Sequence, residues 1–303
     1  MFIYLIHNII NKGSWWTFLE RKVHTLVVED KTIEYSIIGH GIPILMFHGG
    51  HSNCYEELGY AELVKQGFSL ITPSRPGYGR TSKEIADSLF TTSTFYAKLL
   101  DHLHIDKIHI LAVSAGGPSG ISFAAHFPER TMSLSLQSAV TKEWLTKKDK
   151  EYKAAQIIFH PSFERVTWKL ISCLNNYFPI FTFKRFIPSF SKLSPKDVML
   201  QMDKKSIEAV RRMNNHYRSR QGFLIDLVQV NELSSTTLQA VTCPTLIMHS
   251  KNDSAVPLGH AYFAHSKINQ SELCLLDCWG HLIWLGNQAT EVNKKVVSFL
   301  YRE

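Results

Sequence analysis

The chain has 303 residues, of which 45% are hydrophobic and 19% are charged, and its formal net charge is +7. These proportions are typical of a globular protein with a sizeable core and exclude a disordered chain. The basic residues are scattered, so we interpret them as solvated helix faces and expect no nucleic acid partner. Five cysteines without a C-x-x-C pair indicate neither a disulfide framework nor a zinc site, and they suit the reducing cytoplasm.

The first 13 residues form an apolar stretch, M-F-I-Y-L-I-H-N-I-I-N-K-G. About ten apolar residues are too few to span a bilayer. The stretch also lacks the basic leader and the small-residue cleavage site of a signal peptide. We therefore expect an arm that packs on the domain, no stable membrane insertion and a cytoplasmic location.

Strand and helix patterns alternate along the first half of the chain. Two short alternating runs, at 24–29 and 32–38, predict an antiparallel hairpin at a sheet edge. Continuous apolar runs predict buried strands at 42–47, 68–72, 108–113 and 132–136. Helical patterns lie between them at 55–66, at 93–104 with Ser93 as the N-cap, and at 118–127. Such alternation builds an α/β fold, in which helices cover both faces of a parallel sheet.

The pattern between residues 141 and 239 is helical only. We interpret this segment as a helical cap inserted into an α/β core whose two parts are residues 1–140 and 240–303. Sheet-like sequence returns at 244–249 and 272–276, and an amphipathic helix at 288–301 ends the chain.

The strand at 108–113 leads into a corner of small residues, and residues 112–117 read A-V-S-A-G-G. Such a strand-to-helix turn exposes the serine hydroxyl, and the N–H of the next residue helps to bind an oxyanion. Small neighbours are needed because larger side chains would collide with the adjoining strand or helix. Ser114 is therefore the candidate nucleophile, with Ala115 as an oxyanion donor, although serines flanked by small residues also occur in ordinary turns.

A catalytic serine needs a base and a third group that orients the base. Asp253 and His281 each follow a predicted strand, at the carboxyl ends where open α/β sheets place their ligand sites. Asp277 is a competing acid, but it lies four residues before His281 in the same loop, so we expect local hydrogen bonds from it. The order Ser114, Asp253, His281 is that of one of the known serine triads.

A glycine turn, His48-Gly49-Gly50, follows the first predicted parallel strand. A plain turn is one interpretation. The other is that the N–H of Gly50 supplies the second oxyanion donor, which belongs at this place in the chain. We interpret the remaining histidines, His48 and His249 among them, as structural.

Together these motifs resemble the α/β-hydrolase superfamily. They are H-G-G at 48–50, R-P-G-Y-G-R-T at 75–81, A-V-S-A-G-G-P at 112–118, F-P-E-R at 127–130, N-D-S-A-V-P at 252–257 and G-H at 280–281. The resemblance implies an eight-stranded, mostly parallel sheet, a helical cap after the sixth strand, a triad on Ser114, Asp253 and His281, and neither a metal nor an organic cofactor. The chain departs from the family pattern at Ala112, usually glycine, and at Ser74, often Asp.

Serine at position 114 excludes the haloalkane dehalogenases and epoxide hydrolases of this superfamily, which carry Asp there. We expect a carboxylesterase-like enzyme that cleaves an ester or related acyl bond of a small to medium, partly apolar substrate. Cap aromatics such as Trp144, Phe159 and Trp168 are candidates to line its pocket. Carbon-carbon bond hydrolases, acyltransferases and ligand-sensing proteins with little or no turnover are alternatives, and the sequence leaves the oligomeric state open.

Overall fold

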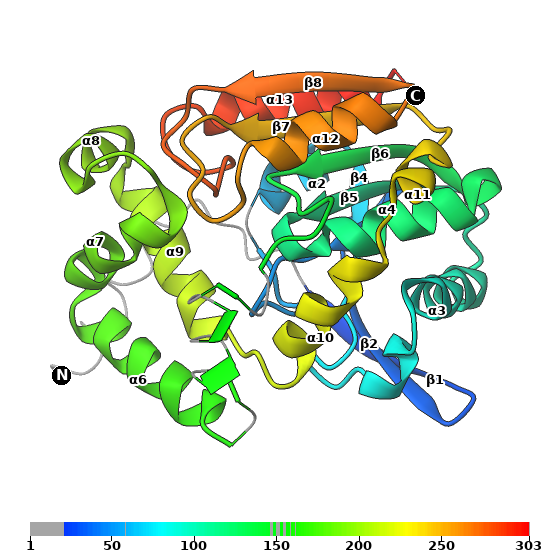
Figure 1. Ribbon diagram of the computed structural model, residues 1–303, viewed down its shortest axis with the longest axis horizontal. Helices are drawn as coiled ribbons and strands as arrows, with labels where there is room; N and C mark the ends of the chain where they lie inside the picture. Colours follow the sequence, from blue (N-terminus) through cyan, green and yellow to red (C-terminus); the bar gives the residue numbers. More distant parts are fainter. Residues whose placement is uncertain are drawn as a thin grey trace, which may run out of the picture.

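The computed structural model describes residues 21–302 except 58, 146, 147, 150, 151, 154, 155, 158 and 161. The predicted N-terminal arm at 1–13 lies outside the described residues. An eight-stranded sheet forms the centre of the molecule (Figure 1). In chain order its strands are β1 (Lys22–Val28), β2 (Lys31–Ile38), β3 (Ile42–Phe47), β4 (Phe68–Pro73), β5 (Ile108–Val113), β6 (Thr131–Gln137), β7 (Thr245–Ser250) and β8 (Ser271–Leu276).

Across the sheet the strand order is β1-β2-β4-β3-β5-β6-β7-β8. The pairings of β1 with β2 and of β2 with β4 are antiparallel, and those from β4 to β8 are parallel. The predicted fold class, an α/β-hydrolase fold with a mostly parallel sheet, is therefore confirmed. The carboxyl ends of the parallel strands meet at one edge, which is where the candidate site lies.

Helices cover both faces of the sheet, as the buried strands require (Figure 1). Along β3, Ile44 and Met46 join one apolar cluster, whereas Leu45 and Phe47 join the other. The first cluster includes buried residues of α2 (Tyr60–Lys65) and α13 (Ala289–Leu300). The second includes residues of α3 (Leu89–His102), α4 (Gly117–His126), α11 (Ser235–Gln239) and α12 (Gly259–Lys267).

Further helices lie between β6 and α11 in the described part of the chain. They are α6 (Glu164–Tyr177), α7 (Pro179–Phe190), α8 (Pro195–Gln201), α9 (Lys204–His216) and α10 (Gly222–Gln229). Both α6 and α7 pack on α9, and in Figure 1 this group stands beside the carboxyl-terminal edge of the sheet. From there, α10 and α11 lead back to the core, where α11 packs on α4 and α12.

Two helix predictions were wrong at their N-terminal ends, and one helix was not predicted. The helix expected at 55–66 begins only at Tyr60, because Gly59 adopts a left-handed conformation with φ of +80°. The N-cap of α3 is Ser88, whose side chain accepts the Thr91 N–H at 3.0 Å, whereas Ser93 lies inside the helix. The sequence analysis also missed α12, whose buried face includes two alanines and therefore gives a weak apolar pattern.

Three buried histidines resist protonation. Burial lowers the pKa of His109 to about 4. Burial and the charge of Lys142 lower the pKa of His260 to about 4, and burial and the charge of Arg75 lower that of His48. In the unfolded chain histidine takes up a proton near pH 6.5. Because the unfolded state binds more protons, we expect the free energy of unfolding to fall as the pH drops from about 6.5 toward 4, by up to about 1.4 kcal/mol per pH unit for each histidine.

Urea titrations at several pH values within this window measure that slope. His109→Asn keeps a partner for the Ser133 hydroxyl. It should reduce the slope by the contribution of one histidine, up to about 1.4 kcal/mol per pH unit. The matched control, His40→Asn at an exposed position, should leave the slope unchanged. Equal slopes for all three proteins would contradict the prediction.

Candidate active site

Ser114 directly follows β5, at the corner from which α4 leads away. Its φ of +52° lies in the left-handed region, so the backbone is strained at this residue. A Cβ on Gly116 would lie 2.4 Å from the carbonyl oxygen of Phe47, and one on Gly117 would lie 2.1 Å from that of Val140. The chain can make this turn only because neither residue has a side chain.

The departure at Ala112 is accommodated by a glycine on the following helix. Ala112 is fully buried, and a Cβ built on Gly120 would lie 2.6 Å from the Ala112 Cβ. The methyl group of Ala112 therefore borders the space that any side chain at position 120 would fill. At the other departure, Ser74 donates to the carboxylate of Glu34 at 2.9 Å, so β2 brings an acidic group to that place.

Asp253 and His281 are in direct contact, although 28 residues separate them. The Nδ1 atom of His281 lies 2.7 Å from Oδ2 of Asp253, and both side chains are buried. The other oxygen, Oδ1, accepts the N–H groups of Ala255 and Val256 at 2.8 and 2.9 Å. Burial alone would raise the pKa of Asp253, but the charge of His281 and the hydrogen bond from His249 hold it below its usual range. An ionised Asp253 makes Nδ1 of His281 the protonated nitrogen and leaves Nε2 as the acceptor.

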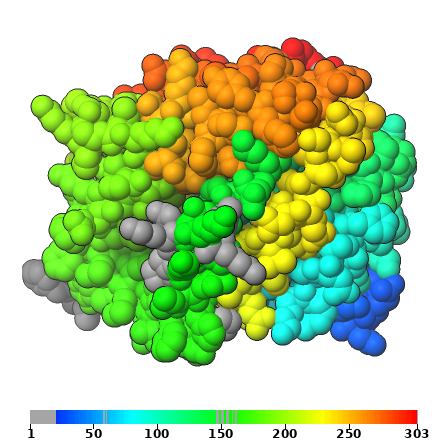
Figure 2. Space-filling model, in the orientation of Figure 1, coloured from blue at the N-terminus to red at the C-terminus, as the bar shows by residue number. Residues whose placement is uncertain are grey.

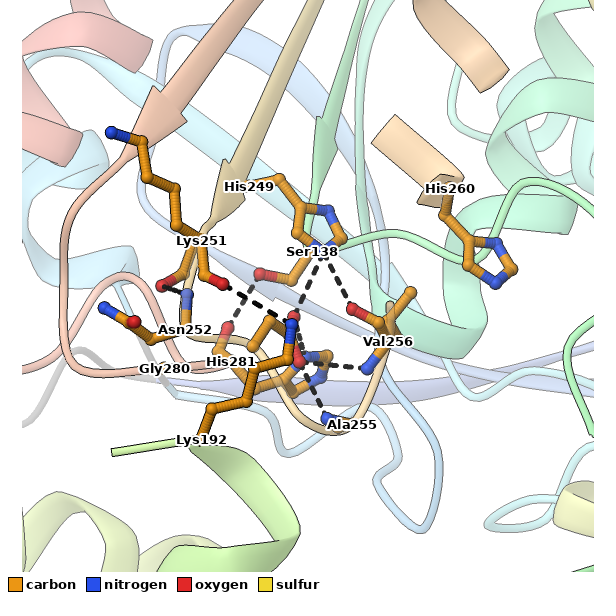
Figure 3. A network of polar contacts seen from close by, with 12 residues as sticks. Ser138, Lys192, His249, Lys251, Asn252, Ala255, Val256, His260, Gly280 and His281 are labelled. Atoms are coloured by element: carbon orange, nitrogen blue, oxygen red, sulfur yellow. Dashed lines mark hydrogen bonds and ion pairs between the residues drawn. The ribbon is translucent and has the colours of Figure 1, made fainter. Parts of the chain in front are cut away.

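His249 is a second histidine at this carboxylate, and the sequence analysis placed it only in or after a strand. Its Nε2 lies 3.3 Å from Oδ2 of Asp253 and 2.9 Å from the carbonyl oxygen of Val256. Figure 3 shows His249, His281 and Val256 converging on the same loop. The sequence feature that could have indicated this contact was the position of His249, at the end of the predicted strand and four residues before Asp253. Asp277, by contrast, is exposed and accepts from Asn252 at 3.3 Å.

A three-residue segment after β6 connects the serine corner to the histidine loop. The N–H of Val140 donates to the carbonyl oxygen of Ser114 at 2.9 Å. The hydroxyl of Ser138 donates to the carbonyl oxygen of His281 at 2.8 Å (Figure 3). Ser114 and His281 therefore lie on either side of this segment. Among the described residues, no hydrogen bond of the Ser114 hydroxyl is present.

The end of α7 holds the histidine loop from the other side. The N–H of His281 donates to the carbonyl oxygen of Phe190 at 2.8 Å, and the two rings stack at 6.3 Å. A Cβ on Gly280 would lie 2.4 Å from that same oxygen. Glycine at position 280 is therefore required for the close approach of α7.

The glycine turn after β3 lies against the serine corner. A Cβ on Gly49 would lie 3.4 Å from the Cβ of Ser114, and one on Gly50 would lie 3.7 Å from the Cβ of Ala115. The turn thus meets the candidate nucleophile at Gly49 and the other candidate oxyanion donor at Gly50.

A buried ion pair holds this turn in place, and the sequence analysis did not find its acid. The guanidinium of Arg75 donates to the carbonyl oxygens of His48 and Gly49, at 2.8 and 3.2 Å, and forms a two-point pair with Asp226 of α10. Although burial opposes its charge, Asp226 raises the pKa of Arg75 above its usual value. Within the Gly49–Gly50 peptide, the C=O and N–H point in opposite directions, so a fixed carbonyl also aims the N–H of Gly50. Asp226 lies 151 residues from Arg75, and no local pattern connects them.

The three cap aromatics named from the sequence lie in one cluster around His51 and Phe223. The ring of His51 lies 4.2 Å from that of Phe159 and 4.1 Å from that of Phe223, and Phe159 stacks on Trp168 at 5.6 Å. Trp144 meets Phe223 edge-on at 6.3 Å. Burial and the charge of Arg75 lower the pKa of His51 to about 3, so the cluster is uncharged at neutral pH.

Within the described part of the chain, no group of three or more His, Cys, Asp or Glu side chains could hold a metal ion. None of the helices in that part is long and apolar enough to cross a membrane.

Comparisons with known proteins agree with this architecture. The profile of a family described as alpha/beta hydrolase fold matches residues 42–164. A Bacillus subtilis (strain 168) protein named "Uncharacterized hydrolase YcgS" is 55% identical over 282 residues, which cover 93% of this chain and 99% of that protein. The chain therefore belongs to the α/β hydrolase family.

Two further relatives cover nearly the whole chain. The solved structure of an alpha/beta hydrolase fold protein from Nakamurella multipartita has a TM-score of 0.80 and 26% identity, covering 92% of this chain and 99% of that chain. A 2-hydroxy-6-oxo-6-phenylhexa-2,4-dienoate hydrolase of Comamonas testosteroni is 23% identical over 295 residues, which cover 92% of this chain and 94% of that protein.

Proposed function

We propose that this chain is a serine hydrolase that cleaves an ester or related acyl bond of a small to medium, partly apolar substrate. The observation that carries the proposal is the buried contact of 2.7 Å between His281 and Asp253, at the same edge of the sheet as the strained Ser114. Acyl transfer requires a base whose tautomer is fixed and a serine that this base can reach.

In the proposed reaction, the Ser114 oxygen attacks the acyl carbon while Nε2 of His281 accepts its proton. Asp253 keeps the proton of Nδ1 in place and stabilises the imidazolium. His281 then gives its proton to the leaving alcohol, and the acyl group stays on Ser114 as an ester. Water, activated by His281 in the same way, hydrolyses this ester and frees the serine.

The N–H groups of Gly50 and Ala115 bind the oxyanion that forms in both steps. A well-aimed donor of this kind stabilises the transition state by about 3 kcal/mol. The contact of Arg75 with the Gly49 carbonyl supports the orientation of the Gly50 N–H. The strained backbone turn at Ser114 supports the orientation of the Ala115 N–H.

Residues 141–239 act as the cap in this proposal, and the cluster with Trp144, Phe159 and Trp168 faces the acyl group. Its aromatic, uncharged character suits an apolar substituent rather than an ionic one. No cofactor takes part in the proposed chemistry.

The second candidate is cleavage of a carbon-carbon bond, because the Comamonas relative is named as a hydrolase of a dienoate. A dienoate carries a carboxylate, which needs a cation in the site. The arginines that contact the glycine turn and His51 are already paired, Arg75 with Asp226 and Arg218 with Glu164. This pairing favours a neutral acyl substrate.

Turnover assays on a matched panel distinguish these functions. We expect p-nitrophenyl acetate and butyrate to be hydrolysed over many turnovers, and faster than a 2-hydroxy-6-oxo-dienoate. The reverse ranking would establish carbon-carbon bond cleavage. A single turnover, with Ser114 still labelled by a fluorophosphonate, would indicate a ligand sensor, and transfer of the acyl group to an added alcohol in preference to water would indicate an acyltransferase.

A further inference from the structure

Helix α6 exposes an apolar stripe. Val166, Leu170 and Leu174 follow one another at helical spacing and are exposed, whereas Glu164, Trp168 and Asn175 of the same helix are buried. A surface helix of a globular protein normally buries its apolar stripe and exposes its polar one. The exposed stripe of α6 leaves a continuous apolar surface without a partner in the described structure.

The apolar surface continues across the turn into α7. Eight side chains, each between 50% and 77% exposed, form what we call the α6–α7 face: Phe163, Val166, Leu170, Leu174, Tyr177, Phe178, Ile180 and Phe181. In Figure 1, α6 and α7 lie together at one end of the molecule, away from α3 and β1. In Figure 2 the light-green part of the chain, to which this segment belongs, lies at the edge of the surface view opposite the blue one.

Within the segment that carries this face, the charges have one sign. From residue 165 to residue 196 the chain contains no Asp or Glu, and every charged residue is basic. All six are exposed: Arg165, Lys169, Lys184, Arg185, Lys192 and Lys196. None of the six forms an ion pair with a described residue.

We propose that the α6–α7 face docks reversibly on an anionic lipid bilayer. Aromatic and aliphatic side chains on one side of a helix, with Lys and Arg beside them, are the features of helices that lie in the membrane interface. The basic residues then face the lipid phosphates, and each adds to the attraction. The same charges disfavour a second copy as the occupant, because a two-fold contact would bring two basic surfaces together.

Vesicle sedimentation with the full chain tests the proposal. The chain should sediment with vesicles of phosphatidylcholine and phosphatidylglycerol, bind weakly to phosphatidylcholine alone, and release as the salt concentration rises. The double variant Lys184→Glu with Arg185→Glu should lower the partition coefficient by at least about tenfold. The double variant Leu170→Ser with Phe178→Ser should lower it similarly, because it removes the groups that enter the interface.

A matched control replaces apolar residues that are equally exposed elsewhere. Val27→Ser with Tyr262→Ser, at positions 65% and 50% exposed, should bind vesicles like the unmodified chain. All variants should keep their circular dichroism spectra and their turnover of a soluble ester, since none touches the candidate active site. Cys173, an exposed residue of α6, provides a site for an environment-sensitive fluorophore whose emission should shift to the blue on binding.

Three results would overturn the proposal. The first is no sedimentation with anionic vesicles, and the second is sedimentation that both face variants retain, which would assign binding to another part of the chain. The third is a dimer in light scattering that Leu170→Ser with Phe178→Ser dissociates, which would identify a second copy as the occupant.

Discussion

Replacement of Ser114 with Ala should lower kcat for an ester substrate by roughly 10⁴- to 10⁶-fold. The reason is that the substitution removes the nucleophile of the proposed reaction. The free energy of unfolding should change little, because Ser and Ala tolerate the φ of +52° about equally poorly, and the hydroxyl has no hydrogen-bond partner among the described residues. Steady-state kinetics measure the fall in kcat, urea titration measures the free energy of unfolding, and labelling by a fluorophosphonate should be lost.

Ser122→Ala is a suitable control, since Ser122 is buried in α4 and bonds to Ser93 and His126. It should retain kcat and labelling within a few-fold. Activity of Ser114→Ala near that of the unmodified chain would remove Ser114 from the mechanism.

Asp253→Asn should lower kcat by roughly 10³- to 10⁴-fold. The carboxylate holds the proton on Nδ1 of His281, whereas an amide can donate to that nitrogen and so favour the wrong tautomer. Asp277→Asn, the matched control, should cost less than about threefold, because Asp277 is exposed and bonds to Asn252.

The two variants are compared by their kcat values at one pH, after their melting temperatures show that both are folded. If Asp277→Asn were the more damaging substitution, the triad acid would have to be reassigned to the loop that follows β8.

Much of the sheet could be predicted because buried strands have a strong sequence pattern. The bounds of β3 and β5 agree with the predicted ranges 42–47 and 108–113, since both strands are apolar on two faces and end in glycine-rich turns. Ser114, Asp253 and His281 could be named for a related reason. Ser114 directly follows β5, Asp253 and His281 lie in the loops after β7 and β8, and parallel strands bring their carboxyl ends to one edge.

The contacts that surround these residues could not be predicted, because they join distant parts of the chain. The pair of Arg75 with Asp226 spans 151 residues, and the bond of Ser138 to His281 spans 143. The local sequence pattern also did not identify the N-cap of α3, because Ser88 and Ser93 have similar N-cap potential. In the structure Ser88 is the N-cap and Ser93 is buried within the helix.

Two of the helices between β6 and β7 are bonded to different parts of the candidate active site. Helix α7 is held at Phe190 to the backbone of His281, and α10 is held at Asp226 to the arginine that braces the Gly49 carbonyl. A helix moves as a stiff rod, so lifting either one away from the sheet breaks its bond and releases the group beneath it. Opening for substrate entry would thus displace either the candidate base or the candidate oxyanion donor. We expect closure to restore both, which would confine the reactive arrangement to the closed, substrate-filled state.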